Sequence, residues 1–400
     1  MSRLTACRIC HADSFESLVD FGEMAQGGLF PTMGVEAPRL PLHLVQCLAC
    51  GLVQLGDRLD VTQLYGDHYG YRSGLNLSMV EHLADLVREE VPRWVDLHAQ
   101  DAVLDIGSND GTLLNQYSPS LQRFGIDPSA KALLPFYQPG ICVVDGFFGK
   151  TTSRELAAPF KVVTSIAMFY DLDDPVGFAK EVRKILAEDG VWILEQGYWP
   201  ELVRQGAYDV ICHEHIEYYS LQDILHIMDV AGLVLKSISF NTVNGGSFRV
   251  VVGKRGPKCD TDYTLRQEAA VRLDPFKEHV ATHGTRLREV LVELKQQGAV
   301  IQGYGASTKG STVLQYACIG PDLLDCIVDV SDAKDGCWTP GTHIPIVRTA
   351  PPPTHYLVGP WHYRESILRR EQAFLEQGGA FLFPLPDIEV VSRNGVAPWR

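Results

Sequence analysis

The chain has 400 residues, 46% of them hydrophobic and 21% charged, with a formal net charge of −14. These values exclude a disordered chain, and the length predicts two or three domains, because single cores usually stop growing near about 250 residues. No apolar run approaches the roughly 18 residues of a membrane span, and the acidic balance argues against a general nucleic-acid surface. We therefore expect neither membrane nor nucleic acid among the partners.

The N-terminus lacks the apolar region of a secretory signal, so we expect a cytoplasmic, thiol-reducing setting. Two Cys-x2-Cys knuckles follow, Cys7 with Cys10 and Cys47 with Cys50. Four thiolates on two tight turns can close a tetrahedral zinc site. Because protein would fill all four positions, the spacing predicts a structural zinc site; four unrelated buried cysteines are the alternative.

The segment after the second knuckle links two predicted units. A short strand is expected over 52–55, and an aromatic stretch that includes Tyr71 covers 65–73. Apolar residues then keep a helical period over 75–91, and Ser78 with Glu81 has the spacing of a capping box. This helix is expected to lead into the second domain.

The second unit opens with an apolar strand over 102–106, a glycine turn and the start of a helix. Its pattern, acid-x-Gly-x-x-x-Gly, contains Asp105, Gly107 and Gly111 and differs from the dinucleotide fingerprint. An acid at the strand end disfavours pyrophosphate and suits a cationic ligand such as S-adenosylmethionine. Asp127 ends the next strand, where a carboxylate can accept hydrogen bonds from ribose hydroxyls.

Further strands and helices alternate after Asp127. Asp145 ends a third strand, near the place where adenine would lie, and a fourth strand leads to Tyr170. A helix over 176–186, a fifth strand over 190–196, a helix over 221–231 and a strand pair over 234–252 complete the pattern. Such alternation predicts a doubly wound parallel sheet with an antiparallel edge, which binds ligands at the carboxyl ends of its strands.

The segment 208–220 falls on this ligand side and concentrates polar groups. It contains Cys212, His213, Glu214 and His215. The two histidines are two residues apart, so on a strand they share a face and on a helix they diverge, and the His-Glu-x-x-His spacing of zinc proteases is absent. We interpret this segment as the active centre; a polar loop with satisfied hydrogen bonds is the alternative.

A boundary is expected near residues 256–258, followed by a helix whose apolar stripe covers 276–294 and in which His283 is expected to be a core histidine. A second strand, glycine turn and helix start then occupy 299–312. This turn ends in Ser-Thr-Lys, groups suited to phosphate at a helix N-terminus, with Lys309 as a local basic group in an acidic chain. Later strands over 324–329, 356–359 and 380–383 surround a helix over 364–377.

In this order, the four cysteines, the Asp-Ile-Gly-Ser-Asn-Asp-Gly turn, His-Glu-His-Ile-Glu-Tyr-Tyr and the Gly-Tyr-Gly-Ala turn resemble S-adenosylmethionine-dependent nucleotide-sugar C-methyltransferases, of the deoxysugar C-3 type. The resemblance covers essentially the whole chain. It implies an α/β fold with a zinc-binding module at 1–74, a Rossmann-like class I methyltransferase domain at 75–255 and a second Rossmann-like domain at 256–400 that binds the nucleotide-sugar.

The resemblance also implies roles for individual residues. His215 would be the base, supported by Glu214 and Tyr71. The nucleotide-linked keto sugar would contact Tyr170, Cys212, His213, Tyr304 and Lys309. The cofactor would be held by Asp105, Gly107, Ser108, Asn109, Gly111, Asp127 and Asp145.

The implied chemistry is consistent with these residue types. Attaching carbon to a sugar requires a carbanion, and a neutral histidine can form one by removing the proton beside a ketone. Some members have Tyr at the position of Cys212 and His at that of Tyr170, so the sugar contacts can differ here. An O- or N-methyltransferase for sugars and an inactive cofactor-binding scaffold are the alternative functions.

Overall fold

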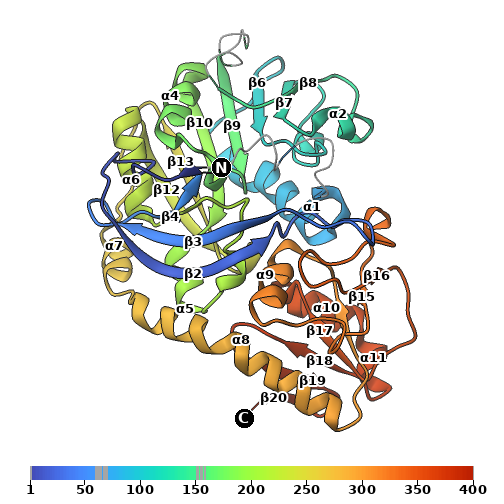
Figure 1. Ribbon diagram of the computed structural model, residues 1–400. Coiled ribbons are helices and arrows are strands. Elements are labelled where there is room, and N and C mark those ends of the chain that lie inside the picture. Colours follow the sequence, from blue (N-terminus) through green and yellow to red (C-terminus); the bar gives the residue numbers. More distant parts are fainter. Residues whose placement is uncertain are drawn as a thin grey trace.

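The computed structural model describes residues 2–58, 65, 71–149, 153, 156 and 159–399. Part of the aromatic stretch predicted over 65–73 lies outside these residues. Two seven-stranded sheets form the centres of the middle and C-terminal parts of the chain, and a four-stranded sheet belongs mainly to the N-terminal part (Figure 1). β2 contacts helices α8 and α9 of the C-terminal part, so the N-terminal sheet lies against it.

The N-terminal sheet has the order β11-β4-β3-β2, and all its pairs are antiparallel. β4 confirms the strand predicted after the second knuckle. β11 belongs to the segment 208–220, which the sequence indicates as the active centre. That segment therefore supplies an edge strand of this sheet. The bounds are β2 (Phe15–Ala25), β3 (Arg39–Cys47), β4 (Val53–Leu55) and β11 (Glu217–Tyr218), with a separate pair β1 (Ser2–Arg3) and β5 (Asp57–Arg58).

The central sheet has the order β12-β13-β10-β9-β6-β7-β8. Strands β10, β9, β6, β7 and β8 are parallel, whereas β13 is antiparallel to both β10 and β12, which confirms the doubly wound sheet with an antiparallel edge. The strands are β6 (Ala102–Ile106), β7 (Gln122–Asp127), β8 (Ile141–Asp145), β9 (Phe160–Ile166), β10 (Leu186–Gly197), β12 (Val234–Asn241) and β13 (Ser247–Gly253).

Both faces of the central sheet are apolar, as its near-continuous hydrophobic strands require. Helices α4 (Pro175–Ile185) and α6 (Leu221–Ala231) pack on the face that carries Leu104 and Trp192. Helix α1 (Leu77–Asp85) packs on the face that carries Val103 and Ile193. A helix that follows the N-terminal strands along the chain therefore covers one face of the central sheet.

Two helix predictions in this domain need correction. The helix expected over 75–91 is α-helical only as α1; it continues as a π-helix, Leu86–Glu90, and a 3-10 helix, Val91–Arg93. Its cap is Asn76, whose side chain accepts from the Ser78 amide, so the Ser78 capping box is wrong. The turn after β6 leads only into a short 3-10 helix, Leu114–Gln116, and not into a regular helix.

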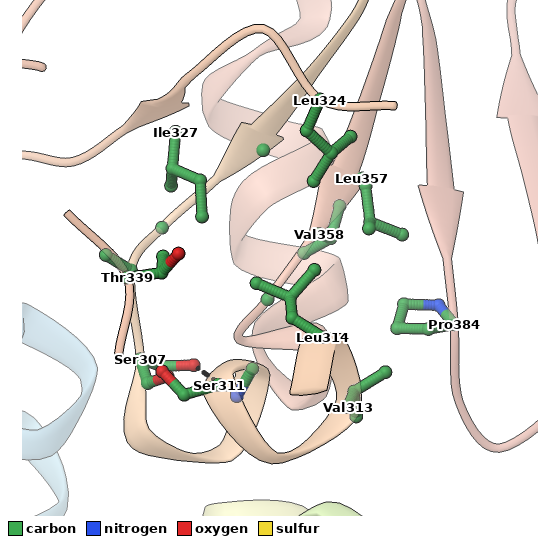
Figure 2. Close-up of a pocket in the computed structure, with 15 residues that line it drawn as sticks. Ser307, Ser311, Val313, Leu314, Leu324, Ile327, Thr339, Leu357, Val358 and Pro384 are labelled. Carbon is green, nitrogen blue, oxygen red and sulfur yellow. Dashed lines mark hydrogen bonds between the residues drawn. The ribbon is translucent and has the colours of Figure 1, made fainter. Parts of the chain in front are cut away.

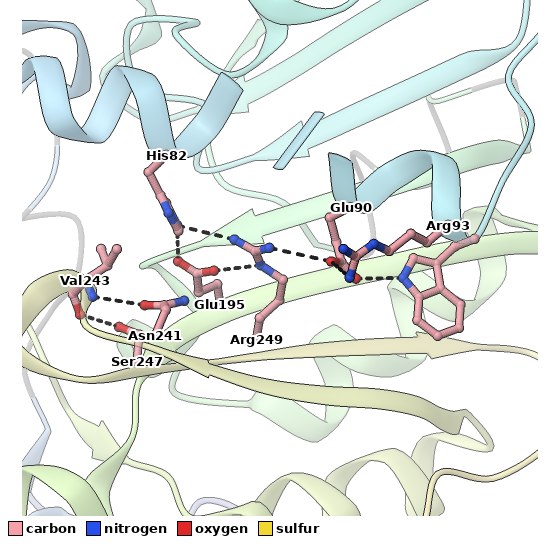
Figure 3. A network of polar contacts seen from close by, with 9 residues as sticks. His82, Glu90, Arg93, Glu195, Asn241, Val243, Ser247 and Arg249 are labelled. Atoms are coloured by element: carbon pink, nitrogen blue, oxygen red, sulfur yellow. Dashed lines mark hydrogen bonds and ion pairs between the residues drawn. The ribbon is translucent and has the colours of Figure 1, made fainter. Parts of the chain in front are cut away.

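A buried charge network fixes α1 to the sheet (Figure 3). Glu195 of β10 accepts hydrogen bonds from His82 of α1, at 2.5 Å, and from Arg249 of β13, at 2.7 Å. Glu90 lies 3.8 Å from Arg249 and accepts from the Trp94 indole at 2.7 Å. Each buried carboxylate therefore has a partner, as buried charges require.

The C-terminal sheet has the order β16-β15-β14-β17-β18-β19-β20, with β16 to β18 parallel and the last two pairs antiparallel. This confirms a second Rossmann-like unit. The strands are β14 (Ile301–Tyr304), β15 (Ile327–Val328), β16 (Ile346–Val347), β17 (His355–Val358), β18 (Ala380–Phe383), β19 (Glu389–Ser392) and β20 (Gly395–Pro398).

Long helix α8 (Leu273–Gln296) connects the central and C-terminal parts and buries the predicted apolar stripe. His283 in that stripe is bonded to the Tyr208 hydroxyl at 2.9 Å and to the Pro384 carbonyl at 2.7 Å, which confirms a core histidine. The helix expected over 364–377 is divided in two. The other helices are α2 (Ala130–Leu133), α5 (Trp199–Arg204), α7 (Asp262–Ala269), α9 (Thr308–Tyr316), α10 (Arg364–Arg370) and α11 (Gln372–Glu376).

Candidate active site

The glycine turn after β6 has a backbone that side chains would not permit. Gly107 and Gly111 have φ of +78° and +75°, in the region that favours glycine. A Cβ at Gly107 would lie 2.9 Å from the Met168 Cγ, and one at Gly111 would lie 2.6 Å from the Tyr137 ring. Each glycine therefore lies against a neighbouring side chain and has no room for a side chain of its own.

Two buried carboxylates end neighbouring strands beside this turn. Asp127 accepts from the Asn109 amide at 2.8 Å and from the Ser129 amide at 2.7 Å. Asp105 accepts from the Thr164 hydroxyl at 2.6 Å. Burial raises the pKa of Asp105 to about 7, and the nearby charge of Asp127 adds to this effect. A bound cation would offset both the burial of the Asp105 carboxylate and its repulsion by Asp127. The two carboxylates therefore fit the cationic end of S-adenosylmethionine.

Tyr137 is a further residue of this turn that sequence reasoning missed. Its hydroxyl donates to the Asn109 carbonyl at 2.6 Å and lies 2.8 Å from the Ser108 hydroxyl. Asp145 pairs with Asp127 at the ends of β8 and β7, and its side chain is exposed. Tyr137 belongs to no sequence motif that was noted above. It reaches the glycine turn from the loop that follows α2.

Replacing Asp105 with asparagine is expected to weaken S-adenosylmethionine binding by roughly 10- to 100-fold, the range for one hydrogen bond to a charged group. The asparagine side chain has the same size as aspartate, but it has no negative charge to balance a bound cation. Isothermal titration calorimetry gives the affinity. Asp101→Asn, just before the N-terminal end of the same strand, serves as the control, and equal affinities for the two variants would remove Asp105 from the site.

The His215 ring is held by a backbone hydrogen bond and an aromatic neighbour. Its Nδ1 lies 3.0 Å from the Val210 carbonyl oxygen and must donate to it, so the neutral ring carries its lone pair on Nε2. The ring packs against Tyr170, with 4.3 Å between centroids. Burial, with a smaller contribution from the positive charge of Lys309, lowers the pKa of His215 to about 4. The imidazole is therefore neutral near pH 7.

Glu214 and Cys212 lie on the same turn as His215. The Glu214 carboxylate covers Gly28, where an added Cβ would lie 1.7 Å from Oε1. Burial raises the pKa of Glu214 to about 7. The Cys212 thiol lies 4.0 Å from Glu214, and burial holds the pKa of this thiol well above its usual range. A protonated thiol is a poor nucleophile, which favours a packing role for Cys212.

Lys309 brings the C-terminal domain to this cluster. Its ammonium donates to the Asn244 carbonyl at 2.6 Å and interacts electrostatically with His215 and His362. Burial lowers the pKa of Lys309, and the negative charge of Asp209 opposes this effect. The Lys309 cation therefore lies between two histidines and a carboxylate where the central and C-terminal domains meet.

Asp209 and His362 are additional buried groups that sequence reasoning missed. One oxygen of Asp209 accepts from the Trp361 indole at 2.7 Å, and its other oxygen has no partner among the described residues. The His362 Nδ1 likewise has no partner in the described part of the chain. Asp209 lies within the segment 208–220 but was not chosen as a site residue, and the bond from the neighbouring Trp361 shows that the segment around His362 lies beside it.

Tyr71 approaches the two turns from the N-terminal side. Its carbonyl accepts from the Asn109 side chain at 3.0 Å, and the Ser73 amide donates to the same side chain at 3.0 Å. The Tyr71 hydroxyl is close enough to Tyr170 and Tyr363 to influence their ionisation. Tyr71 therefore contacts the first glycine turn through its backbone carbonyl, and the residue is exposed.

Two residues of the predicted substrate set lie elsewhere. His213 points toward β3, where its Nε2 lies 3.2 Å from the Leu40 carbonyl oxygen. Tyr304 donates to Glu371 at 2.6 Å, and its ring packs edge-on against Tyr356. These bonds occupy polar groups of both side chains, and their roles at the substrate stay predictions.

The four predicted metal ligands converge. The ligand atoms of Cys7, Cys10, Cys47 and Cys50 all lie within 4.8 Å of one another. Cys7 and Cys50 are 3.6 Å apart and Cys10 and Cys47 are 3.5 Å apart, whereas tetrahedral zinc with bonds of about 2.3 Å places sulfur atoms about 3.8 Å apart. The sulfur cage thus fits a closed structural zinc site.

Three family models match the chain in order: a zinc binding domain over residues 7–65, a methyltransferase domain over 79–238 and a C-methyltransferase C-terminal domain over 242–386. The chain is a methyltransferase. Together with the strand order, these matches confirm the zinc-binding, methyltransferase and C-terminal C-methyltransferase parts of the resemblance, and S-adenosylmethionine is the cofactor of this fold. The described residues of this methyltransferase contain no helix with both the length and the apolarity needed to cross a bilayer.

The chain is also similar to individual proteins. C-methyltransferase NovU of Streptomyces niveus is 28% identical over 409 residues, which cover 96% of each chain. A chain in the complex of the Haloferax volcanii Trm112 methyltransferase activator with a methyltransferase is 16% identical, with a TM-score of 0.38 over 46% of this chain and 95% of that chain. An S-adenosylmethionine-dependent methyltransferase from Clostridium acetobutylicum is 14% identical, with a TM-score of 0.34 over 44% and 92%.

Proposed function

We propose that this methyltransferase transfers a methyl group to carbon in a nucleotide-activated keto-deoxysugar. His215 removes the proton beside the ketone, and the resulting enolate takes the methyl group. The observation that carries this proposal is the hydrogen bond from the His215 Nδ1 to the Val210 carbonyl, because it leaves Nε2 as the only atom that can accept a proton. The proposed domain limits remain 1–74, 75–255 and 256–400.

The charge around His215 supports this role. In the free enzyme its pKa is about 4, lowered first by burial and then by Lys309. The negative charge of a bound diphosphate and of the developing enolate would oppose both effects. Substrate binding would therefore raise the pKa of His215 toward the working pH, where a general base is most effective.

Two neighbours of His215 receive supporting roles. Lys309 carries a buried positive charge beside the base, so it can stabilise the negative charge that develops on the enolate oxygen. Tyr170 packs against the imidazole and restricts its rotation. The Glu214 carboxylate lies over Gly28 and so supports the segment that contains His215.

The cofactor residues that we propose surround the first glycine turn. Asp105 would face the charged end of S-adenosylmethionine and Asp127 the ribose, while the backbone at Gly107, Ser108, Asn109 and Gly111 would lie beneath it. Asp145 is exposed at the neighbouring strand end, in reach of the adenine side. When bound, the cofactor supplies an electrophilic methyl group.

The nucleotide needs more room than the second glycine turn offers. The cavity beside that turn, lined by Ser307, Leu314 and Val358, holds about 20 Å³ (Figure 2). A second cavity of about 530 Å³ lies between the central and C-terminal domains and reaches His362, the neighbour of Lys309. Its volume is in the usual range for ligand sites, so we assign the nucleotide end of the substrate to it. Its walls include Tyr198, Arg204, Phe240, Tyr263, Trp361 and His362.

The substrate class can be tested with labelled S-adenosylmethionine and a panel of nucleotide-linked sugars. Each sugar is offered as the 4-ketone and as the corresponding reduced alcohol. Only ketones are expected to become methylated, because only they form an enolate. Methylation of the alcohols, at oxygen, would favour an O-methyltransferase, and cofactor binding without any turnover would favour a scaffold.

Lys309→Met is expected to raise the pKa of His215 above about 4, toward the ordinary value of 6.5, because it removes the second cause of the shift and leaves burial in place. A larger fraction of the base is then protonated between pH 4 and 6.5. NMR titration of labelled histidines, with the His215 signal assigned from His215→Asn, measures the change. Lys180→Met, on the exposed side of α4, is the control, and an unchanged His215 titration would contradict the coupling.

A further inference from the structure

Gln54 joins the metal site to the rest of the N-terminal module. Its side chain is fully buried, and its Nε2 donates to the Cys7 sulfur at 3.3 Å. Its Oε1 accepts from the Arg8 amide at 3.3 Å and from the Arg8 guanidinium at 3.2 Å. The Arg8 donors fix the oxygen, so the amide nitrogen must face the thiolate. Such bonds to ligating groups orient a metal site.

The backbone of the same residue is part of the catalytic segment's sheet. In the β4–β11 ladder, Gln54 is paired with Glu217 and Val53 with Tyr218. The Leu55 amide donates to the Ile216 carbonyl at 2.9 Å. His215 directly precedes Ile216, so the proposed base lies two residues before a strand that the zinc module holds.

The opposite side of the segment is held by the central domain. The Ile216 amide donates to the carbonyl of Tyr170 at 3.1 Å. Arg8, whose side chain is fully buried, donates to Asp173 at 3.2 Å and to the Leu55 carbonyl at 2.9 Å. Asp173 lies three residues after Tyr170. One arginine of the first knuckle therefore connects both segments that position the His215 ring.

We propose that the zinc site positions the catalytic base, and that Gln54 is the positioning residue that links the two. This inference rests on the proposed role of His215. A bound zinc ion would fix Cys7, the Gln54 side chain donates to Cys7, and the backbone of Gln54 and Leu55 holds residues 216–218, which follow His215 directly. A displacement of about 1 Å at a reacting group can cost about 100-fold in rate, so loss of this link lowers catalysis.

The test uses Gln54→Leu, which keeps the size of the side chain and removes its hydrogen bonds. The expected result is a fall of roughly 10- to 100-fold in kcat for α-proton exchange, with unchanged affinity for S-adenosylmethionine. Zinc release to a chelator is expected to be faster. The control is Gln46→Leu, directly before the second knuckle, whose side chain donates to the Gly51 carbonyl at 3.0 Å and whose strand does not pair with β11.

If Gln54→Leu does not fold, the wild-type protein is treated with a chelator and reloaded with zinc, and exchange and cofactor affinity are followed together. Loss and recovery of exchange at constant cofactor affinity support the proposal. Exchange at the wild-type rate in Gln54→Leu, or in zinc-free protein, would overturn it. Absence of exchange in the untreated wild-type protein would instead reject the proposed role of His215.

Discussion

His215→Asn is expected to abolish both methyl transfer and α-proton exchange, with a loss of about 100- to 10,000-fold, the range attributed to a positioned general base. The asparagine side chain can still donate to the Val210 carbonyl, as Nδ1 does in the wild-type protein at 3.0 Å. It has no basic nitrogen at the place of Nε2. Exchange is measured by NMR in deuterated water with a keto sugar, and methyl transfer with labelled cofactor.

The same variant separates catalysis from folding. Its affinity for S-adenosylmethionine is expected to be unchanged, because Asp105 and the glycine turn are not altered. His226→Asn, on the exposed side of α6, is the matched control and should retain the wild-type rates. Exchange at the wild-type rate in His215→Asn would remove His215 as the base and, with it, the main support for carbon as the methyl acceptor.

The double variant Cys47→Ser, Cys50→Ser is expected to lose zinc and all methyl transfer. The N-terminal sheet is small, and apparent zinc-binding free energies of about 10–16 kcal/mol in small modules are folding free energy as well. Loss of order in β4 would also leave β11 without its neighbour. Metal analysis and limited proteolysis, with cleavage expected first in the N-terminal module, measure both effects.

Cys142→Ser controls for loss of a thiol, since Cys142 is exposed on β8, far along the chain from the knuckles. It should keep zinc and activity. A double knuckle variant that contains no zinc, resists proteolysis like the wild-type protein and transfers methyl groups would contradict a structural role for the metal.

Patterns that depend on neighbouring residues were predicted well from the sequence. The paired spacing of Cys7 with Cys10, and the acid-glycine turn that starts at Asp105, are local features with direct geometric consequences. The parallel sheet and its antiparallel edge followed from the alternation of strands and helices. The buried His283 followed from its place in the apolar stripe of α8.

Contacts between residues far apart in the sequence could not be predicted. No local pattern indicates that Glu217 pairs with Gln54, or that Lys309 reaches the carbonyl of Asn244. The motif residue Tyr304 is a related case, because a strand that ends in a glycine turn can direct its side chains to either face. The capping error at Ser78 arose because Asn76, two residues earlier, competes for the same helix start.

The central claim is that carbon beside a ketone is the methyl acceptor. The most direct test incubates the wild-type protein with S-adenosylmethionine carrying a labelled methyl group and with nucleotide-linked 4-keto sugars, and examines the products by mass spectrometry and NMR. We predict a product heavier by one methylene, in which the labelled methyl is bonded to a ring carbon next to the ketone. A label bonded to oxygen or nitrogen, or no product across a broad panel, would contradict the claim.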